Sequence, residues 1–174
     1  MSEIKLAVIG GSGVYDMEAL EDIEELHIST PFGEPSDVII TGTLSDRPIA
    51  FLPRHGRGHR LTPSEVPYRA NIWALKSLGV ERIISINACG SMKIEYEPRH
   101  IVIPDQIYDN TKAREYTFFG GGLVAHIGIA EPFCTPLRQI LHEATVRAGG
   151  TVHMDGTFIT IEGPRYSTRG ESNI

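Results

Sequence analysis

The sequence predicts an α/β fold, a single domain over residues 1–174 built on a mixed, largely parallel central sheet flanked by helices. Short apolar runs rich in β-branched residues recur along the chain, and segments with helical spacing alternate with them. Glycine- and proline-containing turns separate the two kinds of segment. No run of about 20 apolar residues occurs, so no membrane-spanning helix is expected.

The individual elements follow from local patterns. Buried or half-buried strands are predicted at residues 6–9, 37–42, 48–52, 82–87, 101–103 and 157–161. Helices are predicted at residues 71–78, closed by Gly79, and at residues 135–148, closed by Gly149 and Gly150. The polar stretch 110–122, which ends in three glycines, is predicted to be a long mobile loop.

Composition narrows the classes of function. The chain has 174 residues and a formal net charge of −6, which makes a general nucleic-acid binder a poor candidate because phosphate contacts need a basic surface. Two cysteines are too few for a disulfide framework. The apolar run near the start is too short for a signal peptide, so a cytoplasmic protein is expected.

Two of the predicted strands end in small polar residues. A glycine-rich turn with Ser12 follows the first strand, and the strand at 82–87 ends in Asn87 and is followed by Ala88, Cys89 and Ser91. Glycines allow close approach of the backbone to an anion, and ligands of open α/β sheets gather beyond the carboxyl ends of strands. The alternative is a plain strand-to-loop turn, and Cys89 is either a weak nucleophile or a small buried apolar residue. The glycine turn lacks the third glycine of a dinucleotide-binding fingerprint, which disfavours a flavin or nicotinamide enzyme.

A basic cluster follows the predicted strand at 48–52. Residues 54–60 hold three arginines and two histidines within an acidic chain. Arginine donates paired hydrogen bonds to phosphate, so an oxyanion site is favoured over a solvated basic loop. A metal pair of His55 and His59 is disfavoured, because Gly56 and Gly58 oppose a helix and no carboxylate or cysteine completes a site.

A fourth stretch follows the last predicted strand. Residues 162–168 form a proline-containing turn that presents Arg165, Tyr166 and the hydroxyls of Ser167 and Thr168. The aromatic ring is suited to stacking on a flat heterocycle. The alternative is a core tyrosine in an ordinary turn.

These motifs together resemble the 5′-methylthioadenosine phosphorylases, within the trimeric purine nucleoside phosphorylase superfamily. The resemblance runs from Ile9 to the last residue and includes the motifs at residues 8–13, 30–36, 54–56, 70–76, 88–91, 131–134 and 161–167. It implies the nucleoside phosphorylase fold, a homotrimer and a place in purine and methionine salvage. The implied reaction cleaves the N-glycosidic bond of 5′-deoxy-5′-methylthioadenosine with inorganic phosphate, giving adenine and 5-methylthioribose 1-phosphate, with no cofactor or metal.

The resemblance also implies roles for particular residues. The phosphate-binding positions of the family fall on Ser12, Arg54, His55, Asn87 and Ala88. Asn87 departs from the Thr or Ser that is common at that position, although its amide can still donate a hydrogen bond. On the nucleoside side, Tyr166 matches the residue that packs on the purine, and His126 matches a residue bordering the methylthio pocket of a neighbouring subunit.

Ser167 allows a physical argument about the base. The related 6-oxopurine phosphorylases carry Glu there, and a carboxylate accepts the N1–H of hypoxanthine or guanine. Adenine has no hydrogen at N1, so a carboxylate would face a lone pair at a cost of about 1–3 kcal/mol, whereas a serine hydroxyl donates. A 6-aminopurine substrate is therefore predicted.

The family chain continues past Ile174, and the resemblance places the general acid Asp there, so no catalytic acid is assigned within these residues. Such an acid is typically worth about 10²–10⁴-fold in rate. The sequence is therefore expected to be C-terminally truncated. Two alternatives stay open: a phosphorylase for 5′-methylthioinosine or other purine nucleosides, and a catalytically incomplete phosphate- or nucleoside-binding fragment.

Overall fold

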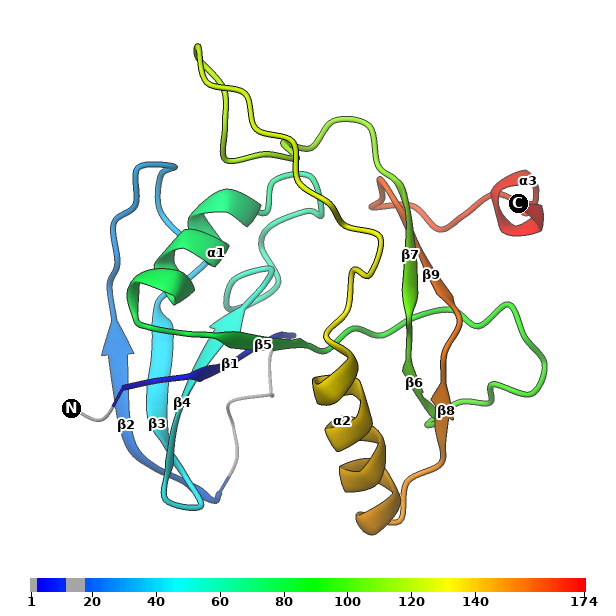
Figure 1. Cartoon of the computed structure of the whole chain (residues 1–174), viewed down its shortest axis with the longest axis horizontal. Helices are drawn as coiled ribbons and strands as arrows, with labels where there is room; N and C mark the ends of the chain where they lie inside the picture. Colours follow the sequence, from blue (N-terminus) through cyan, green and yellow to red (C-terminus); the bar gives the residue numbers. More distant parts are fainter. Residues whose placement is uncertain (1–2, 12–17) are drawn as a thin grey trace. The chain divides into compact units, whose positions relative to one another are not determined.

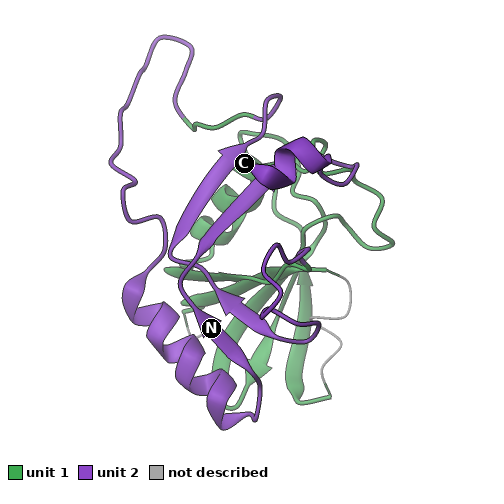
Figure 2. Ribbon diagram, turned by 90° about the vertical axis from the view of Figure 1, so that its right-hand side faces the viewer, with its two compact units in different colours: residues 1–88, 115–118 green, residues 89–114, 119–174 purple. Residues whose placement is uncertain are grey.

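The computed structural model describes residues 3–11 and 18–174. The chain divides into two compact units, one of residues 1–88 and 115–118 and the other of residues 89–114 and 119–174 (Figure 2). The single domain expected from the sequence stays a prediction, since a division into compact units does not by itself define domains. In the described ranges, no helix is both long and apolar enough to span a bilayer.

The first unit is built on a five-stranded sheet with the strand order β2-β3-β4-β1-β5 (Figure 1). The strands are β1 (Leu6–Gly10), β2 (Leu20–Leu26), β3 (Ile39–Leu44), β4 (Arg47–Pro53) and β5 (Arg82–Ser85). Strand β1 runs parallel to both β4 and β5, whereas β2, β3 and β4 form an antiparallel meander. The parallel half of the sheet therefore has three adjacent strands whose carboxyl ends share one edge.

Alternating side chains of this sheet enter two separate apolar clusters. Ala7 and Ile9 join the cluster on one face, which helix α1 (Tyr68–Ser77) covers with Ala74 and Leu75 (Figure 1). The intervening Val8 joins the cluster on the other face. Successive side chains of a strand point to opposite faces of the sheet, so a strand buried on both faces needs a continuous apolar run. Such runs are what predicted these strands from the sequence.

Strand β2 was not predicted from the sequence. Its sequence is LEDIEEL, and most of its side chains are exposed. It pairs only with β3 in the sheet order, so it is an edge strand, and its register shifts between Glu21 and Glu24. Edge strands carry charge and bulges, which removes the apolar alternation that identifies a strand.

The second unit contains two parallel strand pairs. Strand β6 (Ile101–Ile103) pairs with β8 (Val152–Met154), and β7 (Gln106–Asn110) pairs with β9 (Thr157–Ile161). Helix α2 (Thr135–Arg147) packs on β6 and β8. The short helix α3 (Arg169–Asn173) follows β9 and begins at an N-cap threonine, Thr168.

The predicted fold class is confirmed. Four of the six strand pairings in the described ranges are parallel, and helices accompany the sheets. Helix α1 begins three residues before the predicted start at Asn71, and Gly79 closes it with a φ of 92°. Strands β7 and β8 were missed because they are short and lack a clear apolar alternation.

Part of the stretch predicted to be a long loop is anchored to the first unit. The guanidinium of Arg69 pairs with the carboxylate of Glu115 and lies 4.9 Å from the ring centroid of Phe32. The ring of Phe32 meets that of Phe118 edge to face, with centroids 5.2 Å apart. Residues 115–118 are thus held by charge and aromatic contacts.

Candidate functional site

The candidate phosphate site lies where β1, β4 and β5 end. The register pairs Gly10 with Pro53 and Ile9 with Ser85. Beyond the strands, the N–H of Arg54 donates to the carbonyl of Gly10 at 2.9 Å, and the N–H of Ile86 donates to the carbonyl of Ile9 at 2.8 Å. The chain segments that leave the three strands therefore start side by side, as an oxyanion site at this edge of the sheet requires.

Arg54 and His55 are held against each other at the end of β4. The Nε of Arg54 donates to Nε2 of His55 at 3.2 Å, and Nδ1 of His55 faces the carbonyl of Leu61 at 2.8 Å. Because a carbonyl only accepts, Nδ1 must carry the ring proton and Nε2 accepts from arginine. His55 is 9% exposed, so the imidazole is a buried support that fixes the plane of the arginine fork.

The turn after Arg54 takes its shape from glycine. Gly56 and Gly58 have φ values of 71° and 76°, which are left-handed conformations that glycine adopts without strain. A Cβ on Gly56 would lie 3.0 Å from the carbonyl oxygen of Ser36. The rings of His55 and His59 stack with centroids 4.3 Å apart, and the turn between them is not helical, as the glycines predicted.

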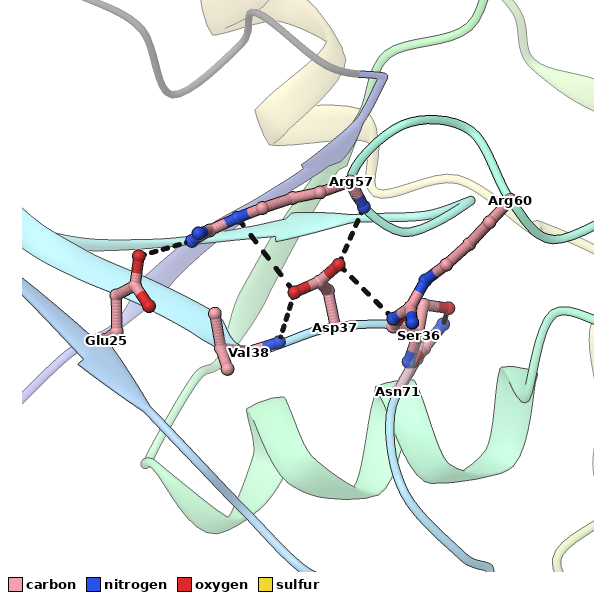
Figure 3. A network of polar contacts seen from close by, with 7 residues as sticks. All are labelled: Glu25, Ser36, Asp37, Val38, Arg57, Arg60 and Asn71. Carbon is pink, nitrogen blue, oxygen red and sulfur yellow. Dashed lines mark hydrogen bonds and ion pairs between the residues drawn. The ribbon is translucent and has the colours of Figure 1, made fainter.

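The other two arginines of the basic cluster are committed to acidic partners (Figure 3). The backbone N–H of Arg57 donates to Asp37 at 2.6 Å, and its guanidinium donates to Glu25 at 2.5 Å. The Nη2 of Arg60 donates to the carbonyl of Ser36 at 2.9 Å and lies 3.5 Å from Asp37. The tertiary structure thus separates Arg54 from Arg57 and Arg60, which fasten the turn to the residues before β3.

The remaining predicted phosphate residues differ in what the structure says of them. Ser12 lies outside the described residues. Asn87 and Ala88 are exposed just beyond β5, and the amide Nδ2 of Asn87 donates to Oγ of Ser85 at 3.1 Å. This short contact ties the Asn87 side chain back to the strand end. The roles of Arg54, His55, Asn87 and Ala88 in binding phosphate stay predictions.

In the second unit, Glu162 fixes the start of the segment that carries Tyr166 and Ser167. Its carboxylate accepts from the backbone N–H groups of Lys112 and Ala113 at 2.5 and 3.0 Å. Arg114 donates Nε to the same carboxylate at 3.3 Å, and its Nη2 donates to the carbonyls of Ile161 and Glu162. The segments that follow β7 and β9 are therefore joined where the strands end.

A second ion pair joins Arg165, at the start of the segment that carries Tyr166 and Ser167, to Glu171 beyond it. Arg165 donates two parallel hydrogen bonds to the carboxylate of Glu171, each 2.8 Å long. Hydrogen bonding to this guanidinium, together with the backbone N–H of Thr168, lowers the pKa of Glu171 to about 2. The same bonds raise the pKa of Arg165. The Arg165 side chain is more than half exposed and that of Glu171 is 22% exposed, so solvent screens the pair, and it contributes geometry more than stability.

The three residues predicted to contact the nucleoside lie in the second unit. The ring of Tyr166 is 95% exposed, which contradicts the alternative of a core tyrosine. The hydroxyl of Ser167 is 2.8 Å from that of Ser172. His126 is exposed within the stretch between Phe119 and α2. Their contacts with a substrate stay predictions.

Two features of this unit went unnoticed in the sequence reasoning. The first is the set of contacts of the Glu162 carboxylate, which join residues about 50 positions apart that no local pattern connects, and the second is the pairing of Arg165 with Glu171. The second had a readable signal, because Thr168 and Glu171 stand at capping-box spacing and both capping hydrogen bonds form. In the described ranges, no three His, Cys, Asp or Glu residues lie together as metal ligands.

The model of the phosphorylase superfamily matches residues 5–174 of this sequence. The chain belongs to the phosphorylase superfamily. It is 55% identical over 169 residues to the S-methyl-5′-thioadenosine phosphorylase of Hyperthermus butylicus, covering 97% of this chain and 62% of the relative. It is 57% identical over 170 residues to the enzyme of the same name from Geobacter sulfurreducens, covering 97% of this chain and 59% of the relative.

Solved structures give the same result. A methylthioadenosine phosphorylase from an antarctic soil metagenomic library superposes with a TM-score of 0.96 at 51% identity, covering 99% of this chain and 61% of that one. The methylthioadenosine phosphorylase of Schistosoma mansoni in complex with adenine gives a TM-score of 0.91 at 41% identity, covering 98% and 69%. These likenesses confirm the resemblance that the motifs indicated and the nucleoside phosphorylase fold. This superfamily member spans about 60% of the length of the first two relatives.

Proposed function

We propose that the protein catalyses, or supplies the binding residues for, phosphorolysis of 5′-deoxy-5′-methylthioadenosine to adenine and 5-methylthioribose 1-phosphate. The observation that carries the proposal is the shared edge of β1, β4 and β5, where Arg54 is bonded to both Gly10 and His55. The names of the relatives support the choice of nucleoside.

Arg54 is the residue to which we assign phosphate capture. Its guanidinium presents N–H groups in a fixed fork, and the bond to His55 sets the plane of that fork. Strand β1 lies between β4 and β5, so residues 87–88 leave the sheet two strands away from Arg54. We assign them to the same phosphate, together with Ser12, which lies outside the described residues. Inorganic phosphate is the co-substrate, and no other cofactor is proposed.

The proposed reaction needs no covalent intermediate with the protein. Cleavage of an N-glycosidic bond passes through an oxocarbenium-like state, whose positive charge a bound phosphate dianion stabilises by Coulomb attraction. Phosphate then forms the new bond to the sugar carbon while the purine leaves with the bonding electrons. Holding phosphate in one orientation replaces a bimolecular encounter and supplies much of the rate enhancement.

We assign recognition of the base to Tyr166 and Ser167, in the second unit. An exposed aromatic ring offers a stacking surface, and a neighbouring hydroxyl donates to an unprotonated N1, as an aminopurine requires. His126 is assigned to the 5′-methylthio side. The proposal includes a homotrimer and a cytoplasmic location, as the family resemblance implies.

The test is phosphate-dependent release of adenine. The protein is incubated with methylthioadenosine, adenosine or inosine, with and without inorganic phosphate, and free base is quantified by chromatography. The proposal expects adenine from methylthioadenosine only when phosphate is present. Binding of phosphate and adenine without release would assign the residues to binding alone, and faster release from inosine would refute the aminopurine assignment.

A further inference from the structure

We propose that Arg165 and Glu171 form a positioning fork that holds Tyr166 and Ser167 in the orientation needed to bind the purine. This inference deepens the proposed function and rests on it. It gives a role to Arg165, which lies in the turn at 162–168 and to which the sequence alone assigns no function.

The fork reaches the backbone of the stacking residue directly. Nη1 of Arg165 donates to the carbonyl of Tyr166 at 2.9 Å and to Oε2 of Glu171 at 2.8 Å. Nη2 donates to Oε1 of the same carboxylate at 2.8 Å. One guanidinium therefore connects the peptide after Tyr166 to a residue five positions further along the chain. The ring itself remains 95% exposed for contact with a ligand.

Glu171, the acidic partner in the fork, is held in place by hydrogen bonds at the start of α3. Oε2 of Glu171 accepts from the N–H of Thr168 at 2.7 Å, and Oγ1 of Thr168 accepts from the N–H of Glu171 at 3.2 Å. The hydroxyl of Ser167 also contacts the hydroxyl of Ser172, at 2.8 Å. Both residues assigned to the base thus lie inside a closed loop of hydrogen bonds that runs from residue 165 to residue 172.

The charges of the fork argue against a direct ligand contact by Arg165. Its two terminal nitrogens already bond a carboxylate and a carbonyl, and the ion pair is electrically neutral overall. Because Glu171 neutralises the guanidinium, Arg165 offers a phosphate little net positive charge. The geometry instead fits a support that orders the exposed loop before the ligand binds, so that less conformational entropy is lost on binding.

The test measures two ligands on the same chain by isothermal titration calorimetry, adenine and inorganic phosphate. The variants are Arg165→Ala, Arg165→Lys and Glu171→Gln. Lysine keeps the charge but does not reproduce the planar fork, so Arg165→Lys is also a loss variant that preserves the overall charge. Arg147→Ala is the matched control, because it removes an arginine of an exposed ion pair in the same unit and leaves the fork.

We expect adenine affinity to fall about tenfold in the three fork variants, within the range of coupling between contacting residues, and to change less than about threefold in Arg147→Ala. Phosphate affinity is expected to stay unchanged in all four, because the phosphate residues belong to the first unit. This split separates positioning from a general loss of structure, which would weaken both ligands together.

Three results would overturn the inference. Unchanged adenine affinity in the fork variants would show that the loop needs no support. Parallel loss of adenine and phosphate affinity would show that the fork only stabilises the fold. Failure of the unaltered protein to bind adenine would instead refute the assignment of the base to Tyr166 and Ser167, and with it the purpose of the fork.

Discussion

Arg54 donates its Nε to Nε2 of His55 at 3.2 Å, so the two residues act as one unit at the end of β4. The imidazole is buried, and its Nδ1 is hydrogen-bonded to the carbonyl of Leu61 at 2.8 Å. The sequence predicts that both residues bind phosphate, and the structure adds that the buried imidazole of His55 supports Arg54. Loss of this support and loss of a phosphate ligand have different signatures in mutagenesis.

Arg54→Ala should weaken binding of inorganic phosphate by about tenfold or more, since hydrogen bonds to charged groups are worth about 1.5–3 kcal/mol. His55→Phe should lower phosphate affinity less and should also lower stability, because Arg54 and the Leu61 carbonyl lose their partner. Calorimetric titration with phosphate and thermal unfolding measure the two effects. Arg147→Ala, on an exposed ion pair, is the control. Equal phosphate affinity in Arg54→Ala and the unaltered protein would contradict the assignment.

Asp37→Asn should reduce the free energy of unfolding by about 1–3 kcal/mol. The carboxylate accepts from the N–H groups of Val38 and Arg57, and an amide would turn a donor toward one of them (Figure 3). Urea unfolding measures the change. The matched control is Glu143→Gln, which removes an exposed helical ion pair and should change stability by less than about 0.5 kcal/mol.

Asn71 and Ser36 should show coupled effects on stability. Oδ1 of Asn71 accepts from the N–H of Ser36 at 2.8 Å, and Nδ2 donates to Oγ of Ser36 at 2.8 Å. Both residues are buried. A double-mutant cycle of Asn71→Ala and Ser36→Ala should give an interaction energy of about 0.5–3 kcal/mol by urea unfolding. Simple additivity would mean that the bond between Nδ2 of Asn71 and Oγ of Ser36 contributes nothing to stability.

Ser167→Glu should weaken adenine binding by about tenfold or more, because the carboxylate would face the unprotonated N1. Hypoxanthine, which has an N1–H, should lose less or gain. The two bases are titrated in parallel against the unaltered protein and Ser167→Ala. If Ser167→Glu bound adenine and hypoxanthine in the original ratio, Ser167 would not face the base.

The pKa of Glu171 predicts how the loop responds to acid. Its pKa falls from 4.5 unfolded to about 2 folded, chiefly through hydrogen bonds from Arg165. A lowered pKa stabilises the fold fully above pH 4.5, and this contribution is lost as the pH falls from 4.5 toward 2. Carboxyl NMR titration should therefore find Glu171 ionised at pH 4, and Arg165→Ala should move its pKa back up. An unmoved titration midpoint would show that Arg165 does not cause the shift.

Much of the site could be predicted from the sequence, and the reasons are local. Strand ends were predicted at residues 9, 52 and 87, where apolar runs stop at small or rigid residues, and they lie at Gly10, Pro53 and Ser85. The N-cap of α3 follows from the spacing of Thr168 and Glu171. By contrast, the acidic edge strand β2 could not be recognised, because its exposed charges remove the alternation.

The sequence by itself determined the fold class, the superfamily and the short list of polar residues beyond the strands. Only the tertiary structure decided which partners each of the three neighbouring arginines meets. Arg57 and Arg60 meet carboxylates and carbonyls that lie between 20 and 32 positions earlier in the chain, while Arg54 meets a strand end and an imidazole. Local pattern records residue type and spacing, whereas the partner of a charge depends on which distant segments the folded sheet brings within hydrogen-bond reach.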